Sequence, residues 1–79
     1  RIDLNPDIDV DVLLEKLQER YSKEEINTLD GVKIDFADKW VHLRKSNTEP
    51  IIRIYSEARS REEADAMADQ IINDIQRLI

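Results

Sequence analysis

Apolar residues recur every three or four positions in two stretches of this chain, and this spacing predicts two helices. The first covers residues 10 to about 21, with Asp9 as its candidate N-cap. The second begins after Ser60, which forms a capping box with Glu63 three residues later. The apolar stripe of this second helix consists of Ala64, Met67, Ala68, Ile71, Ile72, Ile75 and Leu78.

Between the two helices the apolar residues alternate with polar ones, which is the period of a half-buried strand. The alternation predicts strands over 32–36, 40–44 and 51–57, and residues 1–4 add a short edge strand. Asp30 and Gly31, the only glycine, predict a tight turn or a bulge between paired strands, with residues 26–29 before it.

The order strand, helix, three strands, helix predicts an α+β fold. Two amphipathic helices are buried most simply against one face of a mostly antiparallel four-stranded sheet. We find no internal repeat, no low-complexity segment and no linker, so residues 1–79 are expected to form a single domain.

Composition excludes several kinds of chemistry. The chain has 79 residues, of which 38% are charged and 41% hydrophobic, as expected for a small folded domain with a thin core. No cysteine and one histidine leave no disulfide, no thiolate nucleophile and no multi-His metal centre. No leader or membrane-spanning stretch is apparent, so we expect a cytoplasmic protein without a membrane partner. Because the chain begins at Arg1, we expect it to be a piece of something longer.

The net charge of −6 is unevenly distributed. Residues 39–61 hold six basic and two acidic side chains, a local charge of +4, which leaves −10 for the rest. A basic island in an acidic chain favours one local anion and disfavours nucleic acid, because the acidic flanks repel a long polyanion. The simpler alternative is an ordinary solvated strand edge.

The basic island contains a polar loop between two predicted strands. If those strands form a hairpin, Arg44 and Arg53 lie nearly opposite each other on one face. Like charges paired across strands cost a few tenths to about 1 kcal/mol, and a shared dianion would reverse that effect. Ser46, Asn47 and Thr48 add neutral donors to the two arginine forks. The segment therefore predicts a phosphate or carboxylate site, against the alternative of a plain polar turn.

The same segment, Arg-x-Ser-Asn-Thr-Glu-Pro-x-x-Arg from Arg44 to Arg53, closely resembles the phosphate-binding loop of the α-D-phosphohexomutases, the family of phosphoglucomutase and phosphomannomutase. The resemblance extends to Asp-Gly-Val-Lys at 30–33, to the strand that holds Trp40, and to Arg-Ile-Tyr-Ser-Glu-Ala at 53–58. It covers the chain from about residue 29 to its end. It implies the C-terminal, fourth domain of such an enzyme, which closes over a cleft formed with the other domains.

The resemblance also implies roles for individual residues. The substrate's phosphate would be held by Arg44, Ser46, Asn47, Thr48 and Arg53. Meanwhile a phosphoserine in another domain transfers its phosphoryl group, and the bisphosphorylated sugar then turns round and is held in the opposite sense. Neither that serine nor the carboxylates that hold Mg²⁺ in relatives have a counterpart here. We therefore expect no catalytic residue, metal or cofactor in this chain, and no activity from it alone.

The implied partners are a hexose phosphate, a hexose bisphosphate and the other domains of the parent chain. Many phosphoglucosamine mutases have glycine at the position of Asn47, so this residue favours a phosphomannomutase or phosphoglucomutase.

The alternative is a freestanding α+β module that binds a peptide or RNA through Trp40 and Tyr55 on the sheet face. His42 shares that face, either as a peripheral substrate contact or as an ordinary exposed strand histidine.

Overall fold

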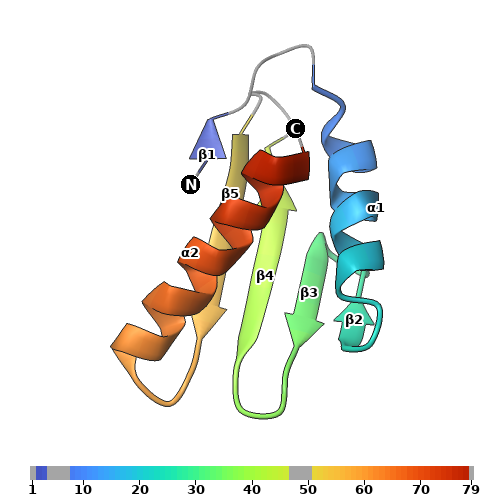
Figure 1. Ribbon diagram of the computed structural model, residues 1–79. Helices are drawn as coiled ribbons and strands as arrows, with labels where there is room; N and C mark the ends of the chain where they lie inside the picture. The colour runs from blue at the N-terminus through green and yellow to red at the C-terminus, as the bar shows by residue number, and fades with distance from the viewer. Residues whose placement is uncertain (1, 4–7, 47–50, 79) are drawn as a thin grey trace.

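A computed structural model describes residues 2–3, 8–46 and 51–78, which form an antiparallel sheet with two helices on one face (Figure 1). The α+β prediction is thereby confirmed. In chain order the elements are β1 (Ile2–Asp3), α1 (Val10–Arg20), β2 (Glu25–Asn27), β3 (Val32–Asp35), β4 (Trp40–Lys45), β5 (Ile51–Glu57) and α2 (Arg61–Leu78).

The sheet has the strand order β1-β5-β4-β3-β2, and every neighbouring pair is antiparallel. The four expected strands are present, and β2 adds a fifth, which pairs with β3 across the turn at Asp30 and Gly31. Its three residues are too few to show a period in the sequence, and only the middle one is half-buried. The first strand of the chain lies at one edge beside β5 and β2 lies at the other (Figure 1).

Both helices begin at the predicted caps. The carboxylate of Asp9 accepts hydrogen bonds from the backbone N–H groups of Asp11 and Val12, at 3.1 and 3.3 Å. The hydroxyl of Ser60 accepts one from the N–H of Glu63 at 3.2 Å. These side chains satisfy donors that a helix cannot satisfy within its first turn.

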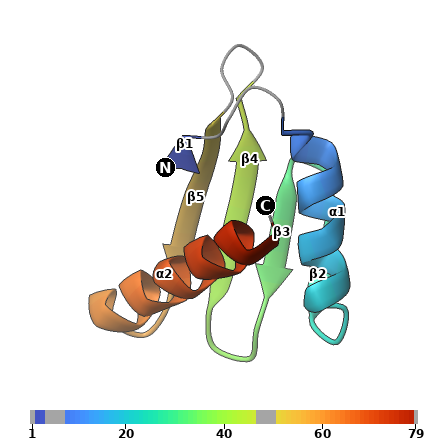
Figure 2. The same cartoon turned by 45° about the horizontal axis from the view of Figure 1, so that its top comes forward.

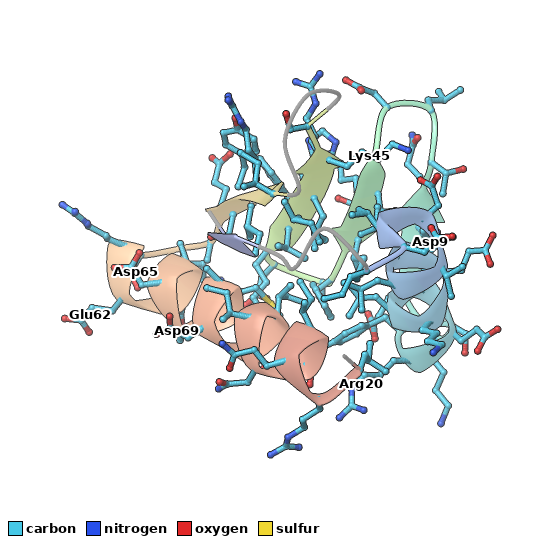
Figure 3. The ribbon with its side chains drawn as sticks, turned by 90° about the horizontal axis from the view of Figure 1, so that it is seen from above. Asp9, Arg20, Lys45, Glu62, Asp65 and Asp69 are labelled. Atoms are coloured by element: carbon cyan, nitrogen blue, oxygen red, sulfur yellow. The ribbon has the colours of Figure 1, made fainter. Side chains whose placement is uncertain are left out.

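The core lies between the sheet and the two helices, which cover the same side of it (Figure 2). Its buried members are Leu13, Leu14, Leu17, Val32, Ile34, Val41, Leu43, Ile52, Met67, Ile71 and Ile75. The alternation predicted for β4 is confirmed, because Val41 and Leu43 are fully buried whereas Arg44 is exposed. No helix of the described residues covers the outer face of the sheet (Figure 3). Arg44 is exposed on that face.

A buried carboxylate joins the end of α1 to α2. Asp74 is only 6% exposed and accepts a hydrogen bond from the hydroxyl of Tyr21. The guanidinium of Arg20 lies 3.2 Å from the same carboxylate, and Gln70 donates to the Tyr21 hydroxyl at 3.0 Å. Burial raises the pKa of Tyr21, and the hydrogen bond to Asp74 raises it further.

Candidate phosphate site

The β4–β5 hairpin places the two arginines of the predicted site opposite each other. In the sheet register Arg44 is the direct partner of Arg53, as the sequence predicts, and both are exposed on the outer face. Pairing continues to the mouth of the loop, where the N–H of Ser46 donates to the carbonyl of Ile51 at 3.1 Å. Asn47 and Thr48 lie outside the described residues.

The paired arginines are only partly neutralised. A guanidinium nitrogen of Arg44 lies 3.5 Å from the carboxylate of Asp30, and both side chains are more than half exposed. Within residues 2–3, 8–46 and 51–78, no carboxylate forms an ion pair with Arg53. Directly opposed residues on neighbouring strands have Cβ atoms about 4.5–5.5 Å apart, so two like charges here repel. The hairpin end is therefore a positive spot that an anion would stabilise.

A small pocket opens at this spot. It has a volume of about 160 Å³, several times the ~30 Å³ share of one water molecule. Its lining residues are Arg44, Lys45, Ser46, Arg53 and Tyr55. Three of the five predicted site residues thus gather around one pocket, which combines cationic forks with hydroxyl groups.

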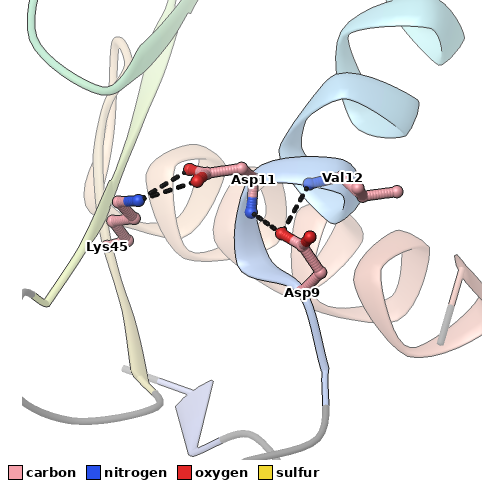
Figure 4. A network of polar contacts seen from close by, with 4 residues as sticks. All are labelled: Asp9, Asp11, Val12 and Lys45. Atoms are coloured by element: carbon pink, nitrogen blue, oxygen red, sulfur yellow. Dashed lines mark hydrogen bonds and ion pairs between the residues drawn. The ribbon is translucent and has the colours of Figure 1, made fainter.

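Two lining residues were not predicted as part of the phosphate site. Tyr55 follows Arg53 by two positions, and the period of two that places both on one face was a usable signal for it. Lys45 points instead toward α1, where its ammonium contacts both carboxylate oxygens of Asp11 at 2.8 and 2.9 Å (Figure 4). Its charge is thereby matched by Asp11, and the contact fastens the end of β4 to the first turn of α1.

His42 and Trp40 make contacts within the outer face. His42 is half-buried and its Nε2 donates to the backbone carbonyl of Asp30, so this nitrogen carries a proton. The imidazole also lies against Tyr55, with ring centroids 6.4 Å apart. Farther along β4, the ammonium of Lys33 lies 5.0 Å from the ring centroid of Trp40. His42 therefore has a structural role in this face, and a substrate contact from it stays a prediction.

The described part of the chain holds no group of three or more His, Cys, Asp or Glu residues that could bind a metal ion. Neither described helix has the length and apolar character needed to cross a membrane.

Residues 6–74 match the family described as "Phosphoglucomutase/phosphomannomutase, C-terminal domain". The chain belongs to this family. The expectation that the chain is the C-terminal domain of such an enzyme is thereby confirmed. The matched residues of this phosphoglucomutase/phosphomannomutase C-terminal domain include β4, β5 and the pocket beside them.

Relatives of the domain are much longer mutases. A phosphoglucosamine/phosphogalactosamine mutase of Sulfurisphaera tokodaii is 37% identical over 81 residues, which is all of this chain and 17% of that protein. A phosphoglucomutase/phosphomannomutase of Thermococcus kodakarensis is 64% identical over 39 residues, 49% of this chain and 9% of the relative. The chain thus spans less than a fifth of each. The relatives include both hexosamine phosphate mutases and a phosphoglucomutase/phosphomannomutase. The assignment to a phosphomannomutase or phosphoglucomutase that Asn47 favours therefore stays a prediction.

Proposed function

We propose that this domain binds the substrate's phosphate in a sugar phosphomutase that moves a phosphoryl group between the 1- and 6-positions of a hexose. The observation that supports this proposal most directly is the pairing of Arg44 with Arg53, which lie on opposed strand positions and line one pocket. Membership of the mutase C-terminal domain family supports the same assignment.

The arginines provide the charge that the phosphate needs. Each guanidinium presents a planar fork that matches two phosphate oxygens, and a dianion between the two strands replaces their repulsion with two attractions. Ser46, with Asn47 and Thr48 from the loop, would supply neutral donors to the remaining oxygens. The site would hold the phosphate of the substrate in place and leave the reacting end to other domains.

Holding the distal phosphate explains how one loop serves both halves of the reaction. A hexose bisphosphate carries a phosphate at each end, so an anchor that reads only phosphate binds either orientation. Phosphoryl transfer depends mainly on positioning and charge stabilisation, and binding energy from the non-reacting end offsets the cost of ordering the cleft.

The transferring phosphoserine and the Mg²⁺ ligands would come from other domains of a cytoplasmic parent enzyme. That ion would supply charge neutralisation at the reacting phosphoryl group. The substrates would be hexose phosphates and bisphosphates, with hexosamine phosphates included because some relatives are named for them.

The proposal is tested in the full-length parent protein with Arg53→Ala. We expect kcat/KM for glucose 1-phosphate, mannose 1-phosphate and glucosamine 1-phosphate to fall about 10- to 100-fold, the effect of losing a charge-assisted contact. The matched control is Arg59→Ala, because this exposed arginine lies beyond the far end of β5 and pairs with Asp38 at 3.4 Å. Circular dichroism checks that both variants fold.

An unchanged kcat/KM in Arg53→Ala would exclude the proposed role of this residue. An equal fall of kcat/KM in Arg59→Ala would show that the loss of any positive surface charge lowers kcat/KM, and that the effect is not specific to Arg53. A parent protein that converts none of the three sugar phosphates would overturn the mutase assignment itself.

A further inference from the structure

The turn at Asp30 and Gly31 packs directly against the part of β4 that carries Arg44. Gly31 has a φ of +71°, a backbone conformation that residues with a side chain rarely adopt. A Cβ atom at this position would lie 2.3 Å from the carbonyl oxygen of Leu43 and 3.2 Å from Cγ of Arg44. The absence of a side chain therefore lets the stem of Arg44 lie against the backbone of the turn.

Two polar contacts hold the same turn to β4. The carboxylate of Asp30 lies 3.5 Å from a guanidinium nitrogen of Arg44, and its backbone carbonyl accepts a hydrogen bond from Nε2 of His42. His42 and Arg44 are two positions apart on β4 and so share its outer face. Because the hydrogen bond from His42 holds the backbone of Asp30 in place, the carboxylate of Asp30 is held beside Arg44.

We propose that Asp30 is a positioning residue for Arg44, which deepens and rests on the proposed phosphate-binding function. Arg44 has Arg53 on its β5 side and the turn on its β3 side. An attraction toward Asp30 draws its guanidinium away from Arg53 and keeps a gap between the two forks. The phosphate occupies that gap.

A contribution to fold stability is a weak explanation for this ion pair. Both side chains are more than half exposed, at 51% and 70%, and exposed pairs of this kind add little to stability. A guanidinium has five N–H donors, so one contact with Asp30 leaves others for a phosphate. Fixing the long arginine side chain before substrate arrives also lowers the entropy that binding must overcome.

A carboxylate beside an anion site has an opposing effect, because its charge repels phosphate. The change in KM on Asp30→Asn therefore decides between the two effects. A raised KM indicates that Asp30 positions Arg44, and a lowered KM indicates that Asp30 mainly repels the phosphate. Glu15 supplies the matched control, because it lines the same groove of about 620 Å³ as Asp30 and Arg44 and forms no ion pair with the described residues. Glu15→Gln removes the same charge without removing the contact.

The experiment measures KM and kcat for glucose 1-phosphate in the full-length protein. The variants are Asp30→Asn, Asp30→Glu, Glu15→Gln, Arg44→Gln and the double variant of Asp30→Asn with Arg44→Gln. We expect Asp30→Asn to raise KM about tenfold with little change in kcat, the pattern of lost uniform binding. Asp30→Glu should recover part of this loss, and Glu15→Gln should leave KM unchanged or lower it.

The double variant shows whether Asp30 acts through Arg44. We expect Asp30→Asn to add no further loss once Arg44 is replaced, because its target is then absent. An unchanged or lowered KM in Asp30→Asn would overturn the proposal, and so would a tenfold loss that persists in the Arg44→Gln background. If Arg44→Gln alone leaves kcat/KM unchanged, the proposed phosphate-binding function fails instead.

Discussion

Arg44 and Arg53 form a pair that folding alone disfavours. Two guanidinium groups on directly opposed strand positions repel, and only Arg44 has a nearby carboxylate in the described part of the chain. Cross-strand pairs of like charge cost a few tenths to about 1 kcal/mol, so an uncharged pair would make a more stable hairpin. Stability therefore does not explain the arrangement, which the proposed binding of an anion would explain.

Gly31 is the residue whose replacement should disturb this hairpin most directly. We expect Gly31→Ala to lower the free energy of unfolding by about 1–3 kcal/mol, because alanine is strained at a φ of +71° and its methyl group would meet the carbonyl of Leu43. Urea denaturation of the chain measures the change. The control is Thr28→Ala in the same turn region, since Thr28 is exposed. An equal effect of both substitutions would contradict this account.

At the scale of elements, the buried carboxylate of Asp74 joins α2, on which it lies, to the end of α1. Removing water from a carboxylate is costly unless hydrogen bonds and an opposite charge replace it. Here the Tyr21 hydroxyl and the Arg20 guanidinium do so, and each comes from the end of α1 or the residue that follows it. The contact fixes how α1 lies against α2.

This link predicts a loss of stability at alkaline pH. The folded-state pKa of Tyr21 is raised above its ordinary value of 10.0, so folding favours the protonated hydroxyl. The corresponding stability is fully present below pH 10 and is lost as the pH rises through the folded-state pKa. In Tyr21→Phe we expect a cost of about 1 kcal/mol at pH 7 and a shallower alkaline decline.

Urea unfolding between pH 7 and pH 11 measures both effects. Tyr55→Phe is the matched control, because Tyr55 is exposed on the outer face of the sheet. A decline of equal steepness in wild type and Tyr21→Phe would show that other groups cause it.

Helices and strands were predictable from the sequence wherever one buried face made the apolar residues recur at regular spacing. Both helices and β3 to β5 followed from apolar spacing, and Asp9 and Ser60 marked the helix starts. The short strand β2 was missed because three residues at a sheet edge carry almost no periodic signal. Asp74 was missed as well, although it lies seven positions after Met67 and so on the buried stripe of α2.

The site was predictable as far as the strand register determines it. The facing of Arg44 and Arg53 followed from the hairpin alone, whereas the contacts of Asp30 and His42 depend on how a separate turn packs against β4. Spacing along the sequence cannot reveal such a contact, because its partners are 12 or more residues apart. The pairing of Lys45 with Asp11, across 34 positions, has the same cause.

At the scale of the whole molecule, the described residues form a compact two-layer domain with one uncovered sheet face. The radius of gyration of 12.0 Å matches the roughly 12 Å expected for a chain of this length. The paired arginines lie on that uncovered face, and the pocket that both of them line, at about 160 Å³, is smaller than the ~300–1,000 Å³ usual for ligand pockets. Other domains would therefore have to complete the enclosure.

It follows that the 79-residue chain alone should convert no sugar phosphate. The expected result is no formation of glucose 6-phosphate from glucose 1-phosphate with glucose 1,6-bisphosphate and Mg²⁺ present. Phosphorus NMR follows the reaction, and the full-length protein serves as the positive control. Detectable turnover by the purified chain would place catalytic groups within it and contradict the division of labour proposed above.

The strand order has a consequence for how the two arginines respond to local unfolding. From Trp40 to Leu43, β4 is paired with β3 on one side and β5 on the other, whereas β1 pairs with only Ile51 and Ile52 of β5. Backbone amides paired on one side open more readily than those in the middle of a sheet. At the level of the two arginines, however, β3 no longer pairs with β4 and β1 no longer pairs with β5, so Arg44 and Arg53 each lie on a strand paired only with the other. A bound anion that bridges both strands would therefore slow hydrogen exchange at both positions alike.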